Sequence, residues 1–269
     1  MRVTFVILPG LSPREIGVLS KEPNRKSRSV WLPSPEKLLI SEERVDVWRV
    51  RLDQTGKASF PDSILAADEI ARADRFHFEK DRLKFVRCRI ALRDLLSKYM
   101  AIRAGEIRFE YQLGGKPQLS QKQNSRKVEF NVSHSGDIAL IAVGAKQRLG
   151  VDVERIRDGI DTSSLAERFF SARERAGLRA LPEKLRLQAF YACWTRKEAF
   201  LKATGDGLSF PLADFSVTTD PTGNPELEEI HGDFDPCNKW ALADLCVGGG
   251  YRATVAGETL YALETYDWH

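Results

Sequence analysis

The pattern of hydrophobic and polar positions predicts alternating strands and helices along most of the chain. Residues 45–50 (VDVWRV) alternate as a strand does. From about residue 62 to residue 100 the apolar residues recur at helical spacing. The resulting stripe consists of Phe85, Cys88, Leu92, Leu95, Leu96 and Tyr99. In one continuous helix, a basic flank of this stripe is formed by Arg75, Arg82, Arg89 and Arg93.

The rest of the chain repeats this alternation. Strands are predicted at 107–111, 128–132, 138–143, 150–154, 215–218, 240–247, 251–255 and 260–265, and helices from about residue 171 and at 182–203. Helix and strand alternate in two comparable halves, so we predict an α+β (mixed α/β) fold with halves at 44–146 and 147–269. Residues 9–43 are rich in Pro, Ser, Arg and Lys and show no period. We therefore expect residues 1–43 to be a loosely ordered extension.

Composition narrows the class of protein. The chain has 269 residues, 42% hydrophobic and 29% charged, with a net charge of +3 that is too small to argue for nucleic-acid binding. Residues 72–103 hold ten Lys or Arg against four acids, which suits a solvated helix face, phosphate ligands or an acidic partner. The four cysteines form no CxxC pair, and no segment reads as a signal peptide or membrane span. We expect a cytoplasmic protein.

Three acids are candidates for a metal site. Asp152 and Glu154 are two residues apart on a predicted strand, so both carboxylates point to one face. Glu198 lies in the middle of the apolar face of the predicted helix 182–203, with Lys202 one turn further on. Together the three acids offer the hard oxygen ligands that suit Mg²⁺ holding a diphosphate. The alternatives are a solvated strand end and an ordinary Glu198–Lys202 helix pair.

Other candidate residues have two interpretations each. In the run FNVSHS, Ser133 and His134 could donate to a phosphate, although a lone His is more often structural. Ser171 and Glu174 form an S-x-x-E capping box, which satisfies a free amide at a helix start. Lys116 follows a Gly-Gly turn signal at 114–115 and could be presented to a ligand.

In order and spacing these motifs resemble those of the Sfp-type 4'-phosphopantetheinyl transferase family. The matching runs are Gly115-Lys116-Pro117, Phe130-Asn131-x-Ser133-His134-Ser135, Gly150-x-Asp152-x-Glu154, Arg168-Phe169-Phe170-Ser171-x-x-Glu174 and Trp194-x-x-Lys197-Glu198-Ala199-x-x-Lys202. The resemblance covers roughly residues 45–265. It implies two half-domains related by a pseudo-twofold axis, each a small sheet packed with helices, with coenzyme A and Mg²⁺ in the cleft between them.

The resemblance also implies roles for single residues. The metal ligands are Asp152, Glu154 and Glu198, and Lys202 faces the diphosphate as a catalytic residue. The coenzyme-binding positions are Ser133, His134, Lys116, Lys197 and Lys202, with Arg89 and Arg75 as basic positions for the 3'-phosphate.

By the same resemblance, a serine hydroxyl of an apo acyl or peptidyl carrier protein attacks the β-phosphorus of coenzyme A and 3',5'-ADP leaves. Glu174, or a water on the metal, would accept the proton. We expect a monomer that binds neither nucleic acid nor membrane. The rival hypotheses are a Mg²⁺-dependent nucleotide hydrolase, a nucleic-acid-binding regulator that uses the Arg-rich helix, and an inactive family member.

Overall fold

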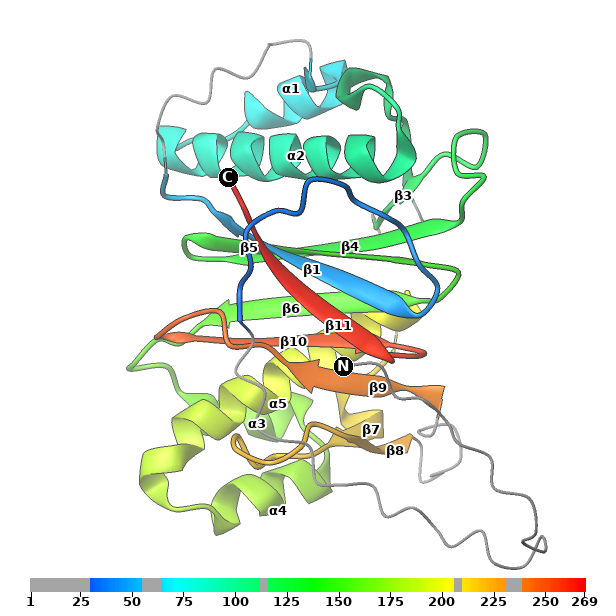
Figure 1. Ribbon diagram of the computed structural model, residues 1–269. Helices are drawn as coiled ribbons and strands as arrows, with labels where there is room; N and C mark the ends of the chain where they lie inside the picture. Colours follow the sequence, from blue (N-terminus) through cyan, green and yellow to red (C-terminus); the bar gives the residue numbers. More distant parts are fainter. Residues whose placement is uncertain (1–29, 55–63, 112–115, 206–209, 231–238) are drawn as a thin grey trace, which may run out of the picture.

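A computed structural model of the protein describes residues 30–54, 64–111, 116–205, 210–230 and 239–269. Its strands form two main sheets, which lie one above the other in Figure 1. The upper sheet has the strand order β11-β1-β5-β4 and the lower sheet the order β6-β10-β9. Two short hairpins, β2-β3 and β7-β8, accompany them. The predicted α+β class is confirmed.

The upper half contains one long helix packed on its sheet. Its elements are β1 (Arg44–Arg51), α1 (Ala67–Ala73), α2 (Glu79–Met100), the 3₁₀ turn η2 (Ala104–Glu106), β2 (Phe109–Tyr111), β3 (Pro117–Leu119), β4 (Val128–Ser135), β5 (Ile138–Ala145) and β11 (Ala262–Trp268). Most of the predicted stripe of α2 is buried against the sheet, as Leu92, Leu95 and Leu96 illustrate. Strand β1 is buried on both faces, because Trp48 packs toward α2 while Val47 packs toward a second core between the sheets.

The lower half also contains a 22-residue helix. Its elements are β6 (Leu149–Arg155), α3 (Thr162–Phe169), α4 (Ala172–Ala180), α5 (Glu183–Thr204), the 3₁₀ turn η4 (Leu212–Asp214), β7 (Phe215–Val217), β8 (Leu227–Ile230), β9 (Ala241–Asp244) and β10 (Tyr251–Gly257). Helix α5 lies against β6 and β10 and is buried around most of its circumference. A third core, with Phe190, Phe200 and Phe215 at its centre, joins α5 to α3, α4 and β7.

The helix predicted over residues 62–100 is two helices. Helix α1 ends at Ala73 and α2 starts at Glu79, and the chain turns between them. The buried carboxylate of Glu69 explains the turn, because it pairs with both Arg89 and Arg93 of α2 (2.6 Å to Arg93 Nε) and so holds α1 against α2. Arg75 lies beyond the end of α1 and does not continue the basic flank of α2.

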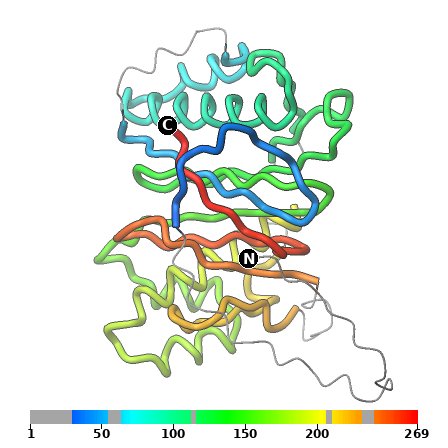
Figure 2. The backbone as a smooth tube through the Cα atoms, viewed as in Figure 1, coloured from blue at the N-terminus to red at the C-terminus, as the bar shows by residue number. Residues whose placement is uncertain are grey.

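Both ends of the described chain complete the upper sheet, which differs from the predicted division. Strand β11, assigned to the half 147–269, pairs in parallel with β1 from Arg44↔Ala262 to Val50↔Trp268. Figure 2 shows its end beside α2, where Trp268 Nε1 donates to Asp94 at 2.8 Å. Residues 30–43, predicted as part of a loose extension, pack on this strand, because the Leu32 amide donates to the Thr265 carbonyl at 2.9 Å.

Candidate functional site

The G-x-D-x-E segment lies where β6, β4 and α5 meet. A glycine is needed at position 150, because a Cβ there would lie 2.2 Å from the Ala199 carbonyl oxygen and 2.4 Å from the Ala203 amide nitrogen. The α5 backbone can therefore approach β6 closely, which brings Lys202 and Glu198 beside Asp152. The close approach at Gly150 therefore brings the G-x-D-x-E motif of β6 together with the W-x-x-K-E-x-x-x-K motif of α5.

Asp152, Ser133 and Lys202 form a hydrogen-bonded triangle across three elements. Lys202 Nζ donates to Asp152 Oδ1 at 2.6 Å and to Ser133 Oγ at 2.9 Å. The Ser133 hydroxyl in turn donates to Asp152 Oδ1 at 2.9 Å. Asp152 is only 2% exposed, so its charge depends on this ammonium group for compensation.

The other two acids lie close enough to Asp152 to be repelled by it. The pKa of Glu154 is raised by burial and by Asp152, although the Ser135 hydroxyl, which donates to Oε2 at 2.8 Å, acts in the opposite direction. The pKa of Glu198 is raised by burial, by Asp152 and by Glu154, and lowered in part by Lys202. The three carboxylates therefore share one electrostatic site, in which Lys202 offsets their mutual repulsion only in part.

The predicted cluster of three carboxylates does not form a metal-binding arrangement with the side chains in their present positions. Within the described ranges, no three His, Cys, Asp or Glu side chains are arranged to hold a metal ion. The residues nevertheless fit a divalent cation, because Asp152 Oδ2 is buried without a hydrogen-bond partner and the pKa values of Glu154 and Glu198 are raised by burial and by the neighbouring acids. Carboxylate oxygens are the donors that Mg²⁺ prefers. The three-ligand assignment stays a prediction.

Cations gather around His134, on the neighbouring strand. The side chain of His134 keeps contact with solvent, yet its pKa lies below its ordinary value. Nearby protein atoms desolvate the imidazole, and Lys202, Arg72 and Lys84 repel its protonated form. Lys202, Arg72 and Lys84 therefore lie close enough to His134 to act on its charge, and Lys84 is itself paired with Asp137 at 2.7 Å.

Lys116 lies at the opposite end of this junction. Its Nζ donates to the backbone carbonyl of Lys202, near the C-terminal end of α5, where a cation complements the helix dipole. The pKa of Lys116 is lowered mainly by burial. Lys116 also lines a cavity of about 400 Å³ between β3, β4 and the end of α5. Residues 114 and 115 of the predicted turn lie outside the described residues.

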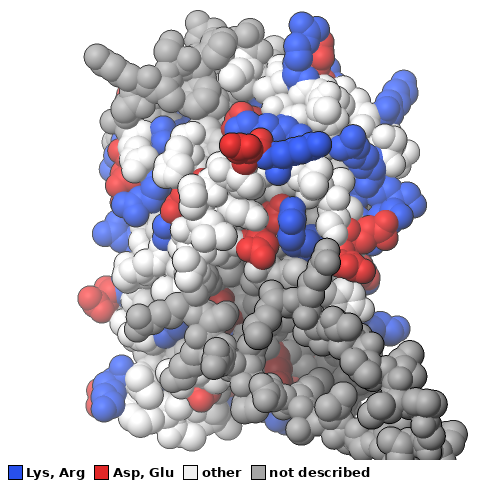
Figure 3. Space-filling model, in the orientation of Figure 1, with Lys and Arg blue, Asp and Glu red and all other residues white. Residues whose placement is uncertain are grey.

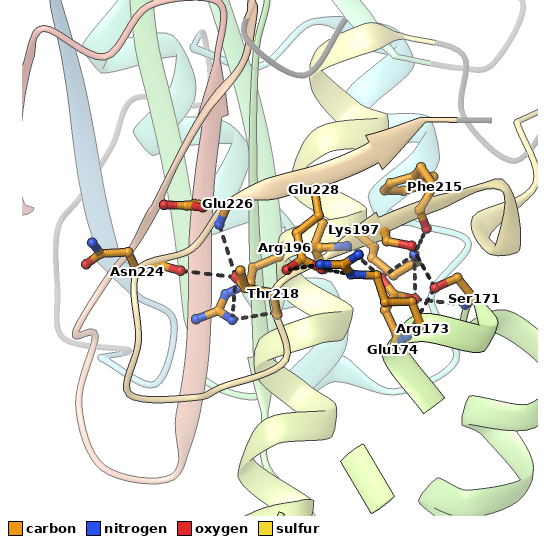
Figure 4. Close-up of polar contacts among 12 residues, drawn as sticks. Ser171, Arg173, Glu174, Arg196, Lys197, Phe215, Thr218, Asn224, Glu226 and Glu228 are labelled. Atoms are coloured by element: carbon orange, nitrogen blue, oxygen red, sulfur yellow. Dashed lines mark hydrogen bonds and ion pairs between the residues drawn. The ribbon is translucent and has the colours of Figure 1, made fainter. Parts of the chain in front are cut away.

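Glu174 and Lys197 are placed in the core rather than at this junction. Figure 4 shows their side chains pointing toward each other between α4 and α5. Lys197 Nζ lies 2.6 Å from Glu174 Oε1 and 2.6 Å from the Phe215 carbonyl oxygen, and neither side chain of the pair is exposed. Glu174 also accepts from the Ser171 amide at 2.8 Å, which completes the predicted capping box. Both residues serve packing in this structure.

The two arginines expected at the 3'-phosphate differ in their surroundings. The guanidinium of Arg89 pairs with buried Glu69 and stacks over Phe109, 4.7 Å from its centroid. Arg75 is exposed beyond α1. Two of the cations that lower the pKa of His134, Arg72 and Lys84, were not selected by the sequence interpretation. Helical spacing alone could not have found them, because the break between α1 and α2 determines where both side chains point.

The face of the molecule in Figure 3 has no single sign of charge, because Lys and Arg side chains lie among Asp and Glu. None of the described helices combines the length and apolar character that crossing a membrane requires. The described cysteines, Cys88, Cys193 and Cys246, form no disulfide among themselves. The expected cytoplasmic location stays a prediction.

Comparisons with known proteins find similarity over both halves. Residues 148–256 match the model of the 4'-phosphopantetheinyl transferase superfamily, and residues 54–146 match that of the 4'-phosphopantetheinyl transferase N-terminal region. The chain is 37% identical to the 4'-phosphopantetheinyl transferase HetI of Nostoc sp., over 84% of this chain and 92% of that relative. It is 30% identical to the 4'-phosphopantetheinyl transferase Sfp of Bacillus subtilis (65% and 75% covered). It is 31% identical to the L-aminoadipate-semialdehyde dehydrogenase-phosphopantetheinyl transferase of Xenopus laevis (70% and 67%).

Proposed function

Because the chain belongs to the 4'-phosphopantetheinyl transferase family, we propose that it moves the phosphopantetheine arm of coenzyme A to a serine of an apo acyl or peptidyl carrier protein. The observation that carries the proposal is the junction of β4, β6 and α5, where Asp152, Ser133 and Lys202 lie within hydrogen-bond distance of one another. The comparisons support neither a nucleotide hydrolase nor a nucleic-acid-binding regulator.

The charges of the junction suit a bound diphosphate. Lys202, whose Nζ lies 2.6 Å from Asp152 Oδ1 and whose charge acts on His134, would contact a diphosphate oxygen. Asp152, Glu154 and Glu198 would hold Mg²⁺, which when bound supplies positive charge to the phosphate oxygens. His134, Arg72 and Lys84 would contact the other phosphate oxygens of the coenzyme. The cavity beside Lys116 would accommodate its nucleotide end.

The transfer forms one bond and breaks one. The carrier serine Oγ attacks the β-phosphorus, and the bond between that phosphorus and the bridging oxygen breaks as 3',5'-ADP leaves with the electron pair. Negative charge grows on the bridging oxygen in the transition state. Lys202, whose Nζ donates to Ser133 Oγ at 2.9 Å, would stabilise that charge.

The serine proton must pass to an acceptor, and the position of Glu174 argues against direct transfer to it. Its two oxygens accept hydrogen bonds from Lys197, from the Ser171 amide and from the Val217 amide, at 2.6–2.9 Å. Only 1% of Glu174 is exposed, so a substrate hydroxyl could reach it only if α4 moved away. We propose that Glu174 supports the fold of the active site and that the serine proton passes instead to a water at the junction of β4, β6 and α5.

A direct test measures 3',5'-ADP release from coenzyme A by chromatography, with and without an apo carrier protein. The proposal predicts release only with the carrier present, and none with a carrier whose acceptor serine is replaced by alanine. Release without any carrier would indicate a hydrolase instead. The variant Lys202→Met should lose transfer, and because it leaves the buried Asp152 carboxylate without its ammonium partner, thermal unfolding must first show that the variant is folded at the assay temperature.

A further inference from the structure

Strands β4 and β6 run side by side across the two halves, but no backbone ladder joins them within these two fully described strands. Polar side chains of β4 take the place of the ladder. Asn131 Oδ1 accepts from the Val151 amide at 2.8 Å, and Ser135 Oγ accepts from the Arg155 amide at 3.1 Å. Between them, Ser133 Oγ accepts from the Val153 amide at 3.4 Å.

The spacing of these contacts is regular. Residues 131, 133 and 135 lie on one face of β4. Each accepts from the amide twenty residues further along the chain, so the bonded amides belong to every second residue of β6. Because both strands have a period of two, the three bonds fix one register between the halves. Val151 is fully buried, so solvent does not replace the bond to its amide.

Two of the three side chains also orient an acid. The Ser133 hydroxyl donates to Asp152, and the Ser135 hydroxyl donates to Glu154 Oε2 at 2.8 Å. Each serine therefore accepts from one β6 amide and donates to the carboxylate of the preceding β6 residue. The register of the strands and the direction of the carboxylates are set by the same hydroxyl groups.

Resting on the proposed function, we infer that Asn131 and Ser135 are positioning residues of the transfer reaction. Neither has been placed in contact with coenzyme or carrier. Asn131 holds β6 in register with β4, so that Asp152 meets Lys202 and Ser133, and Ser135 aims Glu154 into the same site. Side chains that orient the carboxylates of a metal site typically change metal affinity or activity about 10–100-fold when removed.

The test uses the full-length chain and two readouts that do not depend on turnover. Hydrogen exchange of individual amides measures how well the β4 side chains protect the β6 amides. Calorimetry with Mg²⁺ and coenzyme A, without carrier, measures the affinity for Mg²⁺. Asn131→Ala should speed exchange at the Val151 amide at least about 10-fold by removing its acceptor. Ser135→Ala should weaken Mg²⁺ binding about 10–100-fold, and Ser135→Thr, which keeps the hydroxyl, should restore it.

Gln123→Ala is the matched control. It removes a side-chain acceptor 2.8 Å from the Arg108 amide, within the upper half and away from β6. It should leave Mg²⁺ affinity and the transfer rate unchanged. Asn131→Ala should lower the transfer rate about 10–100-fold, because a shift of β6 would move the Asp152 carboxylate out of position. The comparison uses protein shown to be folded by its thermal transition.

The outcomes separate the inference from the proposed function. If Asn131→Ala and Ser135→Ala keep wild-type exchange and wild-type Mg²⁺ affinity, the inference is wrong even when the wild type transfers normally. If the wild type transfers nothing to any carrier, the proposed function is wrong, while the exchange data still decide whether the ladder exists. Equal loss in Ser135→Ala and Ser135→Thr would also overturn the inference, because the hydroxyl would then not matter.

Discussion

Replacing Glu174 by glutamine tests whether this residue supports the fold or accepts the serine proton. Glutamine keeps the shape of the side chain and its capping contact with the Ser171 amide, but it removes the charge. Lys197 would then keep a buried ammonium group with neutral acceptors in place of a carboxylate, namely the glutamine oxygen and the Phe215 carbonyl. The variant therefore separates a buried ion pair from a proton acceptor.

The magnitude follows from the burial of the pair. Both side chains are fully inaccessible, so solvent cannot stabilise the charge that remains. Breaking a buried ion pair by removing one partner costs about 3–5 kcal/mol of the free energy of unfolding. For a chain of this size each kcal/mol corresponds to about 2–4 °C, so the melting temperature should fall by roughly 6–20 °C.

The assay combines thermal unfolding by circular dichroism with carrier modification at a temperature well below the transition. The double variant Glu174→Gln/Lys197→Met removes both charges and should recover most of the lost stability, because a neutral buried pair has no uncompensated ion. The surface pair Arg173–Glu228 supplies the control (2.8 Å). Glu228→Gln should lower stability by less than about 1 kcal/mol.

The opposite pattern would refute this reasoning. If Glu174→Gln melts within about 2 °C of the wild type and loses about 10²–10⁴ in rate, Glu174 acts as the base. The structure predicts instead a strongly destabilised variant whose folded fraction retains most of its activity.

Three further predictions concern single positions. Gly150→Ala should lower stability by about 1–3 kcal/mol or more and abolish transfer, since its Cβ collides with the α5 backbone, whereas Gly249→Ala, with open space around the new Cβ, should be neutral in both assays. Trp31→Ala should cost about 1–3 kcal/mol, because Trp31 donates to the Cys246 carbonyl at 2.6 Å and stacks under Arg49; an unchanged melting temperature would show that residues 30–43 are a loose extension after all. The pKa of His134 is lowered in the folded protein, so the unfolded chain binds the proton more tightly and the free energy of unfolding should fall as pH drops below about 6.5. In unfolding curves at pH 7 and pH 5, His134→Gln should lose less stability between the two pH values than the wild type. An equal loss in both proteins would contradict the prediction.

Helices and strands could be predicted from the sequence where their apolar residues recur with a regular period. The apolar stripe of α2 and the alternation of β1 both follow from which residues face a core. The partner of a strand does not follow from periodicity, and β11 pairs with a strand more than 200 residues away. The break between α1 and α2 was missed for the same reason, because it depends on the contact of Glu69 with Arg89 and Arg93.

In the candidate site, too, the sequence predicted the position of a side chain on its helix but not the group that it contacts. The sequence singled out Glu198 as the charged residue on the most buried face of α5, but Glu198 is only half-buried and its neighbour Lys197 is fully buried. A cation can lie there because Glu174, 23 residues earlier, provides the matching charge. Helical spacing gives the direction of a side chain but not the group that meets it, so it could not distinguish these two neighbours.

The most direct test of the central claim is intact-protein mass spectrometry of a panel of apo acyl and peptidyl carrier proteins incubated with the chain, coenzyme A and Mg²⁺. We expect at least one carrier to gain the mass of a single phosphopantetheine group. The gain should disappear with EDTA, with a carrier that lacks its acceptor serine, and with Asp152→Asn, which removes the charge at the centre of the junction. A carrier modified equally well by Asp152→Asn, or a panel left wholly unmodified by the wild type, would contradict the account.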